Sequence, residues 1–400
     1  MPTSEHQWAA LWPLDPTVAF LNHGSYGACP AAVLAHQSAL RAELEAEPVR
    51  FLGRELDGRL DVARAALGAF VGADPDDLAF IGNATSGVNA VLRSLEFATG
   101  DELLTTDHAY AACKNTLDYV ARRTGARVVV ATVPFPVAAP EAVVSAVLEK
   151  VTARTRVAMV DHITSATGLV LPIERLVGEL RARGVETLVD GAHAPGMVPL
   201  DLRALGAAYY SANCHKWLCT PKGSAFLWVR RDCQAGIHPL TISHGATGER
   251  PGRTRFRLEF DWTGTQDPTA WLTVPMAIEY LGGLVPGGWP ALMARNRALA
   301  LEARRTLCAA VGTAPACPDE MIGTLASVLL PDSVTTETGW RVPEPLQARL
   351  FGGHGIEVPI FRWPAAPRRH VRISAQLYNR AEQFTRLADA LRKELAAERR

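Results

Sequence analysis

The sequence predicts an α/β protein, with a large and mainly parallel sheet of seven strands followed by a small C-terminal α+β domain. Between about residues 45 and 285, short apolar runs alternate with helix-length amphipathic stretches, which is typical of parallel strands covered on both faces. After a Pro/Gly cluster at residues 282–290 the pattern changes to longer helices rich in Arg, Ala and Leu. A chain of 400 residues also exceeds one ordinary core, so two domains are expected.

Each expected strand of the large sheet is a short run rich in Val, Leu, Ile or Ala. The runs are residues 76–82, 101–106, 126–133, 155–163, 185–192, 207–213 and 224–229. Helical spacing of apolar residues predicts the helices between them, at about residues 86–97, 109–124, 140–153 and 173–183.

The C-terminal part has its own alternation of helices and strands. Helices are expected at about residues 291–311, near 343–352 and at 380–398, and strands at 326–330 and 369–376. We expect residues 1–30 to pack with this small domain, residues 31–285 to form the large domain, and residues 286–400 to form the small one.

Composition narrows the class of partner. The 41 basic residues balance 41 acidic ones, so neither nucleic acid nor an anionic membrane is expected as a partner. The apolar runs are too short to span a bilayer, and the N-terminus does not have the pattern of a signal peptide. The seven cysteines form no CxxC pair and no cluster with zinc spacing, so we expect no metal site and a reducing, cytoplasmic location.

Two charged residues follow neighbouring predicted strands, where parallel sheets place their ligands. Asp190 ends the run in VETLVDGAHAPG, and Lys216 lies just past the next run, in YYSANCHKWL. A lysine can form a Schiff base with a cofactor aldehyde, and a carboxylate can keep a pyridine nitrogen protonated. We therefore expect pyridoxal 5′-phosphate (PLP) as cofactor, although a strand-end Asp and a surface Lys are each common alone.

A phosphate site is expected where GNATSGVN follows a strand and opens a helix. The main-chain N–H groups of Ala84 and Thr85, with the hydroxyls of Thr85 and Ser86, would hold a dianion at the helix N-terminus, where the unpaired amides and the helix dipole favour it. Asn83, directly before them, is also expected to contact the cofactor. Asn213 and His215 are expected to contribute from the opposite side. Taken alone, Asn-Ala-Thr-Ser is also an ordinary N-cap and turn.

Several motifs in a fixed order carry a resemblance to a known family. They are FLNHGSYGACP, GNATSGVNAVLRS, YAACKNTLDYV, TSATGLVLPI, VDGAHAPG, NCHKWLCTPKG, FDWTGTQDPTAWL and VRISAQLYN. Together they resemble fold-type-I PLP enzymes of the class V aminotransferase group, in the branch of isopenicillin N epimerase-like proteins and hercynylcysteine sulfoxide lyases. The resemblance covers nearly the whole chain and implies the fold of that group.

The resemblance also implies roles for residues around the cofactor. Tyr110 is placed where relatives stack a His on the pyridine ring, and its phenol would carry a proton. His193 is placed against the cofactor's 3′-oxygen, and Ser165 lies where some relatives have an Asn near that oxygen. Thr265 would reach the phosphate of a neighbouring subunit, which implies a homodimer. An ordinary turn remains the alternative for Thr265, and a helix-start core residue for Tyr110.

For the substrate, the resemblance implies a small-molecule amino acid. Arg372 matches the arginine that binds the substrate α-carboxylate through two parallel hydrogen bonds, although a strand arginine in a surface ion pair would also fit. Asn22 and His23 are further candidates for substrate contact in the N-terminal loop. Lys216 would take the Cα proton after the substrate has replaced it on the cofactor.

The expected function is therefore a PLP-dependent enzyme, isopenicillin N epimerase-like, that acts at the Cα of an amino acid. Epimerisation needs a second acid, for which Tyr110 or a histidine of the cleft is the candidate. The alternatives are a C–S lyase and a class V aminotransferase. Residues 352–363 lack the nucleophilic cysteine of cysteine desulfurases, so persulfide chemistry by that route is not expected. A dehydrogenase is disfavoured because no G-x-G-x-x-G follows the first strand, and a regulatory module because no DNA-binding segment is present.

Overall fold

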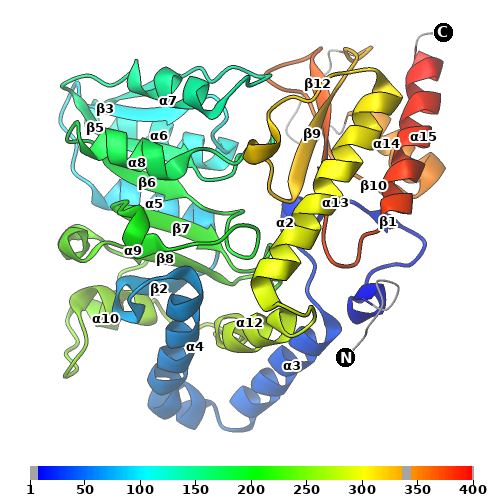
Figure 1. Ribbon diagram of the computed structural model, residues 1–400. Helices are drawn as coiled ribbons and strands as arrows, with labels where there is room; N and C mark the ends of the chain where they lie inside the picture. The colour runs from blue at the N-terminus through cyan, green and yellow to red at the C-terminus, as the bar shows by residue number, and fades with distance from the viewer. Residues whose placement is uncertain (1–7, 336–343, 399–400) are drawn as a thin grey trace.

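The computed structural model describes residues 8–335 and 344–398, and its centre is a seven-stranded sheet (Figure 1). The strand order is β2-β8-β7-β6-β5-β3-β4, and every pairing is parallel except the two that β8 makes. The strands are β2 (Leu78–Ile81), β3 (Glu102–Thr106), β4 (Arg127–Ala131), β5 (Thr155–Asp161), β6 (Glu186–Asp190), β7 (Tyr209–Asn213) and β8 (Ala225–Val229). The predicted mainly parallel sheet of seven strands is confirmed.

Helices cover both faces of this sheet because its strands are apolar on both sides (Figure 1). One face packs against α5 (Ala84–Ser94), α6 (Ala111–Thr124) and α10 (Arg255–Asp261), and the other against α4 (Leu56–Val71) and α8 (Ile173–Arg181). The other helices of this part are α2 (His23–Tyr26), α3 (Ala31–Ala46), α7 (Pro140–Leu148), α9 (Leu202–Leu205), α11 (Thr269–Leu272) and α12 (Val274–Gly282). The sequence did not predict α3, α4, α10 or α12.

A second, smaller sheet lies beyond the long helix α13 (Gly288–Val311). It has the order β11-β12-β9 and is antiparallel. The elements that follow α13 in this part of the chain are β9 (Leu325–Leu330), α14 (Pro345–His354), β10 (Ile356–Glu357), β11 (Ile360–Phe361), β12 (Arg369–Ser374) and α15 (Ala381–Glu398). Helices α13 and α15 bury their apolar sides against this sheet (Figure 1). The helix expected near residues 343–352 is α14, and its expected first residue lies outside the described part of the chain.

The N-terminal segment joins this smaller unit through a pairing that the sequence did not predict. Strand β1 (Ala19–Phe20) pairs in parallel with β10, and the main-chain N–H of Leu21 donates to the oxygen of Glu357 at 2.9 Å. The expected domain limits after residues 30 and 285 stay a prediction. Within residues 8–335 and 344–398, no helix has the length and apolar character needed to cross a bilayer.

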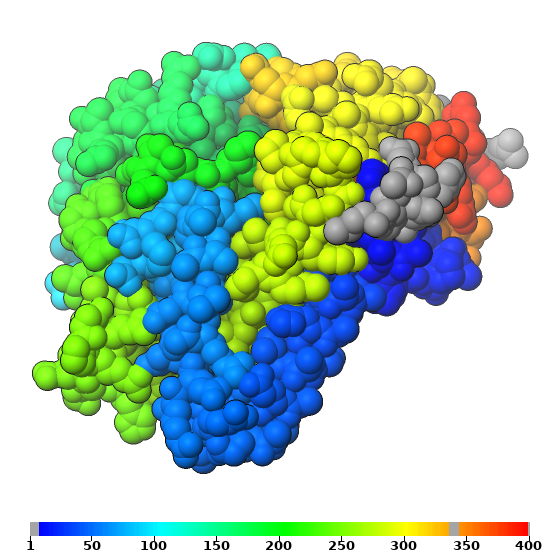
Figure 2. All heavy atoms as spheres, turned by 60° about the horizontal axis from the view of Figure 1, so that its bottom comes forward, coloured from blue at the N-terminus to red at the C-terminus, as the bar shows by residue number. Residues whose placement is uncertain are grey.

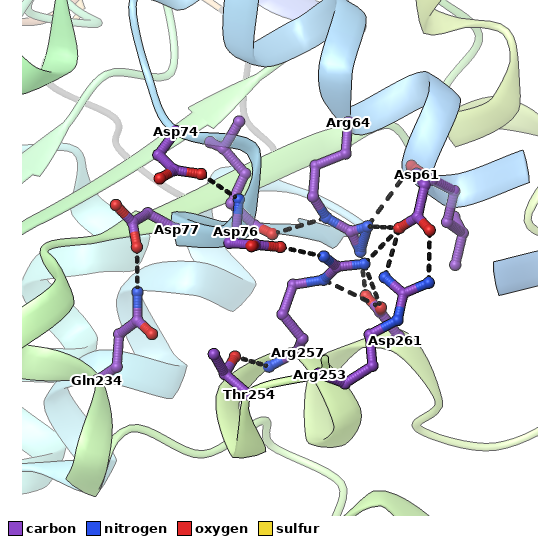
Figure 3. A network of polar contacts seen from close by, with 12 residues as sticks. Asp61, Arg64, Asp74, Asp76, Asp77, Gln234, Arg253, Thr254, Arg257 and Asp261 are labelled. Atoms are coloured by element: carbon purple, nitrogen blue, oxygen red, sulfur yellow. Dashed lines mark hydrogen bonds and ion pairs between the residues drawn. The ribbon is translucent and has the colours of Figure 1, made fainter. Parts of the chain in front are cut away.

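Helices α3 and α4 project from one edge of the molecule (Figure 2). An ionic network around two buried arginines, Arg64 and Arg257, connects α4 with α10 (Figure 3). The side chain of Arg257 is only 4% exposed and pairs with Asp61, Asp76 and Asp261, while the fully buried Arg64 pairs with Asp261. Removing a carboxylate that pairs with a buried arginine leaves that charge uncompensated, so the network stabilises the packing of α10 against α4.

Candidate active site

A cavity of about 400 Å³ lies at the carboxyl ends of the parallel strands. Most residues proposed from the sequence for cofactor binding line it, namely Asn83, Ala84, Thr85, Tyr110, Ser165, Asp190, His193, Asn213, His215 and Lys216. The remaining lining residues are Ser25, Tyr26, Asp161, Ile163 and Ala192. The segments that the sequence placed after separate strands therefore meet at one edge of the sheet.

Lys216 lies in the irregular turn between β7 and β8. The turn ends at Cys219, which has a φ of 55°, a left-handed conformation that is uncommon for residues other than glycine. The amino nitrogen Nζ lies 3.1 Å from Nε2 of His193. Burial, together with the charge of Arg372, lowers the pKa of Lys216 to about 8, against the opposing effect of Asp190. A neutral amine is the form that reacts with an aldehyde or accepts a proton.

His193 is fixed in one tautomer by its neighbour Trp217. The indole Nε1–H can only donate, and it lies 3.3 Å from Nδ1 of His193, so Nδ1 accepts. Burial and the charge of Lys216 hold the pKa of His193 well below its usual range, so the ring is neutral and carries its proton on Nε2. That proton points at Lys216.

Asp190 ends β6 and is buried. Its carboxylate accepts hydrogen bonds from the main-chain N–H of Ala192 at 3.0 Å and from the thiol of Cys113 at 3.2 Å. Burial raises the pKa of Asp190, while these two hydrogen bonds favour the ionised form. This carboxylate is therefore held in place for a cationic partner in the cavity.

Asp161 is a second carboxyl in the cavity, and the sequence reasoning missed it. It ends β5 directly beside Asp190 in the strand register. Neither of its oxygens has a hydrogen-bond partner within the described residues, although the Tyr110 main chain and Lys216 favour its ionised form. Burial and the neighbouring Asp190 raise the pKa of Asp161 well above its usual range. Of the two carboxyls, Asp161 is therefore the more readily protonated one.

The N-terminus of α5 opens on the same cavity. The side chain of Asn83 caps the helix, accepting from the N–H of Ser86 at 2.9 Å. The N–H of Ala84 donates to Oδ1 of Asn213 at 2.8 Å, so the expected role of this N–H toward a phosphate needs correction. The N–H and hydroxyl of Thr85 remain for an anion, in the field of the helix dipole.

His215 lines the cavity opposite this helix end. Its Nδ1 lies 2.9 Å from the main-chain oxygen of Ser224. A carbonyl oxygen can only accept, so Nδ1 carries the proton. Burial lowers the pKa of His215 to about 4, so the ring is neutral. It would therefore contact an anion as a neutral group.

Arg372 is 1% exposed and lies just behind the cavity wall. It donates to the main-chain oxygen of Ser165 and to Oγ of Ser25, at 3.2 Å for the latter, and its Nε has no partner in the described chain. Its guanidinium also lies 4.9 Å from the ring centre of Phe361. Burial lowers the pKa of Arg372 to about 10, which leaves it charged at neutral pH, and no carboxylate of the described residues pairs with it.

Two tyrosines lie at the cavity and reach solvent. Tyr110 precedes α6 and is 45% exposed, and Tyr26 is 76% exposed. Burial of its inner part raises the pKa of Tyr110, so its phenol is protonated at neutral pH. It can therefore donate a proton or a hydrogen bond into the cavity.

Besides Arg372, three proposed residues do not line this cavity. Asn22 donates to the carboxylate of Glu357 at 3.0 Å, and His23 is completely buried. Thr265 is exposed on the loop between α10 and α11, which leaves its expected role in a neighbouring subunit a prediction. Among the described residues no group of three or more His, Cys, Asp or Glu is placed to hold a metal ion.

The donor set of the cavity fits PLP. A primary amine of lowered pKa, an adjacent buried carboxylate and a helix N-terminus are the groups that bind its aldehyde, ring nitrogen and phosphate respectively. The neutral phenol of Tyr110 would supply a further donor beside the ring.

Comparisons with known proteins agree with this arrangement. The family model described as Aminotransferase class-V matches residues 28–387. Isopenicillin N epimerase of Amycolatopsis lactamdurans is 36% identical over 394 residues, which covers 95% of this chain and 96% of that protein. An L-cysteine desulfhydrase of Arabidopsis thaliana is 29% identical over 403 residues, which covers 94% of this chain and 87% of that protein.

The fold is shared with solved structures as well. A cysteine desulfurase from Escherichia coli superposes with a TM-score of 0.78 at 20% identity, and the match covers 100% of both chains. The expected fold type and the expected resemblance to the family are both confirmed.

Proposed function

The chain belongs to the class V aminotransferase family of PLP-dependent enzymes, and on that basis we propose that it moves a proton at the Cα of an amino acid. The reaction proposed first is epimerisation, as in the isopenicillin N epimerase relatives. The substrate is a small-molecule amino acid with a free α-carboxylate.

One observation carries the proposal. The buried guanidinium of Arg372 has no carboxylate partner in the described chain, and it contacts Ser25 and Ser165, which both line the cavity. A buried cation without a counter-charge is costly, and an arginine offers a carboxylate two parallel hydrogen bonds. A substrate carboxylate at this end of the cavity would supply the missing charge.

Each residue of the site has its own proposed role in the reaction. When bound, PLP supplies the electron sink that acidifies the substrate Cα. Arg372 orients the carboxylate, and the neutral amine of Lys216 accepts the Cα proton. His193 holds that amine in place through its Nε2–H. Tyr110 carries a phenol proton at the cavity and is the proposed second acid for return of a proton to Cα.

C–S bond cleavage is the second candidate, because cysteine desulfhydrases are among the relatives. It begins with the same proton transfer to Lys216 and differs in the departure of a sulfur group from Cβ. None of the seven cysteines lines the cavity, so no thiol of the chain is placed there to accept that sulfur.

We also propose that the site is completed in a homodimer. Thr265 lies on an exposed loop outside the cavity of its own chain, which leaves it free to reach a neighbouring subunit. Light scattering would give the mass in solution, and Thr265→Ala should weaken PLP binding without changing that mass. A monomer with full PLP affinity would contradict this proposal.

The experiment for the reaction follows the Cα proton in D₂O by proton NMR. The PLP-loaded protein is incubated with L- and D-amino acids, S-substituted cysteines and their sulfoxides, with Lys216→Ala as the control. Loss of the Cα signal with the other signals intact supports epimerisation, and appearance of pyruvate supports C–S lysis. Retention of the Cα proton in every compound would contradict the proposal.

A further inference from the structure

His23 is completely buried, yet both of its ring nitrogens have polar partners. Nε2 lies 2.9 Å from the main-chain oxygen of Lys216, and Nδ1 lies 2.8 Å from the hydroxyl of Tyr378. The ring also packs at 4.7 Å from the ring centre of Trp217. The histidine therefore contacts the residue after Lys216 and the main chain of Lys216 itself.

The direction of these hydrogen bonds follows from the acceptor. A carbonyl oxygen can only accept, so Nε2 of His23 carries a proton and donates a hydrogen bond to the main-chain oxygen of Lys216. Burial lowers the pKa of His23 to about 3, so the ring is neutral and Nδ1 has a free lone pair. The Tyr378 hydroxyl then donates to Nδ1, and the main-chain N–H of Ala28 also points there at 3.3 Å.

The segment around His23 packs closely against the lysine turn, which is the turn between β7 and β8 that carries Lys216. Gly27 has a φ of 72°, and a Cβ at this position would lie 2.2 Å from the main-chain oxygen of His215. From the other side, a Cβ on Gly196 would lie 2.5 Å from the main-chain oxygen of Trp217. The turn is thus held between two segments that approach it closely only because both carry glycine.

A direct contact of His23 with substrate, as proposed from the sequence, does not fit this placement. The ring is fully buried and does not line the cavity. The hydrogen bond from its Nε2 goes to the main-chain oxygen of Lys216. The side-chain amine of Lys216 is instead contacted by His193.

We propose that His23 is a positioning residue that fixes the main chain of Lys216, and that Tyr378 fixes His23 in the tautomer able to do so. The inference rests on the proposed role of Lys216 as the residue that holds PLP. It assigns to the N-terminal loop a structural link between the lysine turn and the part of the chain in which β12 carries Arg372 and the segment after β12 carries Tyr378.

The test compares three variants of the PLP-loaded protein: His23→Ala, His23→Gln and Tyr378→Phe. His23→Gln keeps a side-chain N–H that can reach the Lys216 oxygen, and Tyr378→Phe removes only the hydroxyl. His244→Gln is the matched control, because His244 is exposed and lines a different cavity. Two quantities are measured: the pH midpoint of the visible absorbance of bound PLP, and kcat and KM for Cα exchange.

For His23→Ala we expect a shifted absorbance midpoint and a fall in kcat of about tenfold, the effect of one lost hydrogen bond, with KM nearly unchanged. His23→Gln should recover most of both, and Tyr378→Phe should shift the midpoint in the same direction by less. His244→Gln should match the unaltered protein.

Two results would overturn the inference. One is a His23→Ala variant with unchanged midpoint and kcat, and the other is a change in KM alone, which would indicate a substrate contact. If His23→Ala does not fold, Tyr378→Phe provides the same comparison with a smaller change. Failure of the proposed function is separately visible, because the unaltered protein would then show no PLP absorbance dependent on Lys216.

Discussion

Nζ of Lys216 lies 3.1 Å from Nε2 of His193, and the histidine is the donor. Trp217 occupies Nδ1 of the same ring with its indole N–H, which places the ring proton on Nε2. An ammonium group has no lone pair to accept that proton. The contact therefore selects the neutral amine of Lys216, in agreement with its lowered pKa of about 8.

The first prediction concerns the pH dependence of PLP uptake by the cofactor-free protein. Because only the neutral amine reacts with an aldehyde, and burial lowers the pKa of Lys216 to about 8, the rate should rise with pH to a plateau above about 8. Stopped-flow absorbance from pH 6 to 11 would measure it. A midpoint near 10.4, the ordinary lysine value, would contradict the interpretation.

Arg372→Leu should raise KM for amino-acid substrates by on the order of 10²- to 10³-fold, because a buried charge pair with the substrate is lost. Arg372→Lys should recover only part of the affinity, since an ammonium cannot form the two parallel hydrogen bonds. The matching amine without a carboxylate is the control substrate. Equal losses for amino acid and amine would show that Arg372 does not bind the carboxylate.

Replacement of Asp161 should change the pH dependence of stability. The pKa of Asp161 is raised in the folded protein, so the unfolded chain loses this proton first as pH rises above about 4. Stability therefore falls between about pH 4 and the folded pKa, by about 1.4 kcal/mol for each unit by which the pKa is raised.

Asp161→Asn removes this penalty, because the amide is neutral at every pH. The cofactor-free variant should unfold at higher denaturant concentration than the unaltered protein at pH 7, and the gap should close toward pH 4. Asp389→Asn, at an exposed position, is the control and should show no such gap. A variant less stable at pH 7 would mean that Asp161 is ionised in the folded protein.

The network in Figure 3 predicts unequal effects of two substitutions that break ion pairs. Asp261→Asn should destabilise the protein by about 3–5 kcal/mol, because it removes the carboxylate that pairs with the buried Arg64 and Arg257. Arg41→Met removes an exposed pair with Asp267 and should cost at most about 1 kcal/mol. Urea unfolding of both variants measures the difference, and equal losses would contradict the account.

The sheet was predictable because its strands are continuous apolar runs. A run such as TLVD, which ends in Asp190, is buried on both faces, and its polar end marks the edge where ligands bind. The same reasoning applies to the run that ends in Asp161, which has its carboxylate at the equivalent position. That signal was present in the sequence, but only Asp190 has a lysine, Lys216, just past the next apolar run.

Other features of the fold are not predicted by any pattern in the local sequence. Strand β1 has two residues and pairs with β10, more than 330 positions away, so no periodicity could reveal it. Helix α10 is short, and its buried side chains include the charged Arg257, which pairs with Asp61 of α4, as well as Phe256 and Phe260, so an apolar pattern alone does not mark it as a helix. The burial of His23 depends on the approach of Tyr378, which only the folded chain defines.

The hydrogen bonds from His23 to Lys216 and from Tyr378 to His23 join residues separated by 193 and 355 positions. The lysine turn therefore cannot reach its final form while the C-terminal segment is still inside the ribosome. Because contacts of such sequence separation form slowly, this pocket would be among the last parts of the molecule to assemble during synthesis. Capture of the cofactor would then follow the emergence of the segment that carries Tyr378 and would report on the completeness of folding.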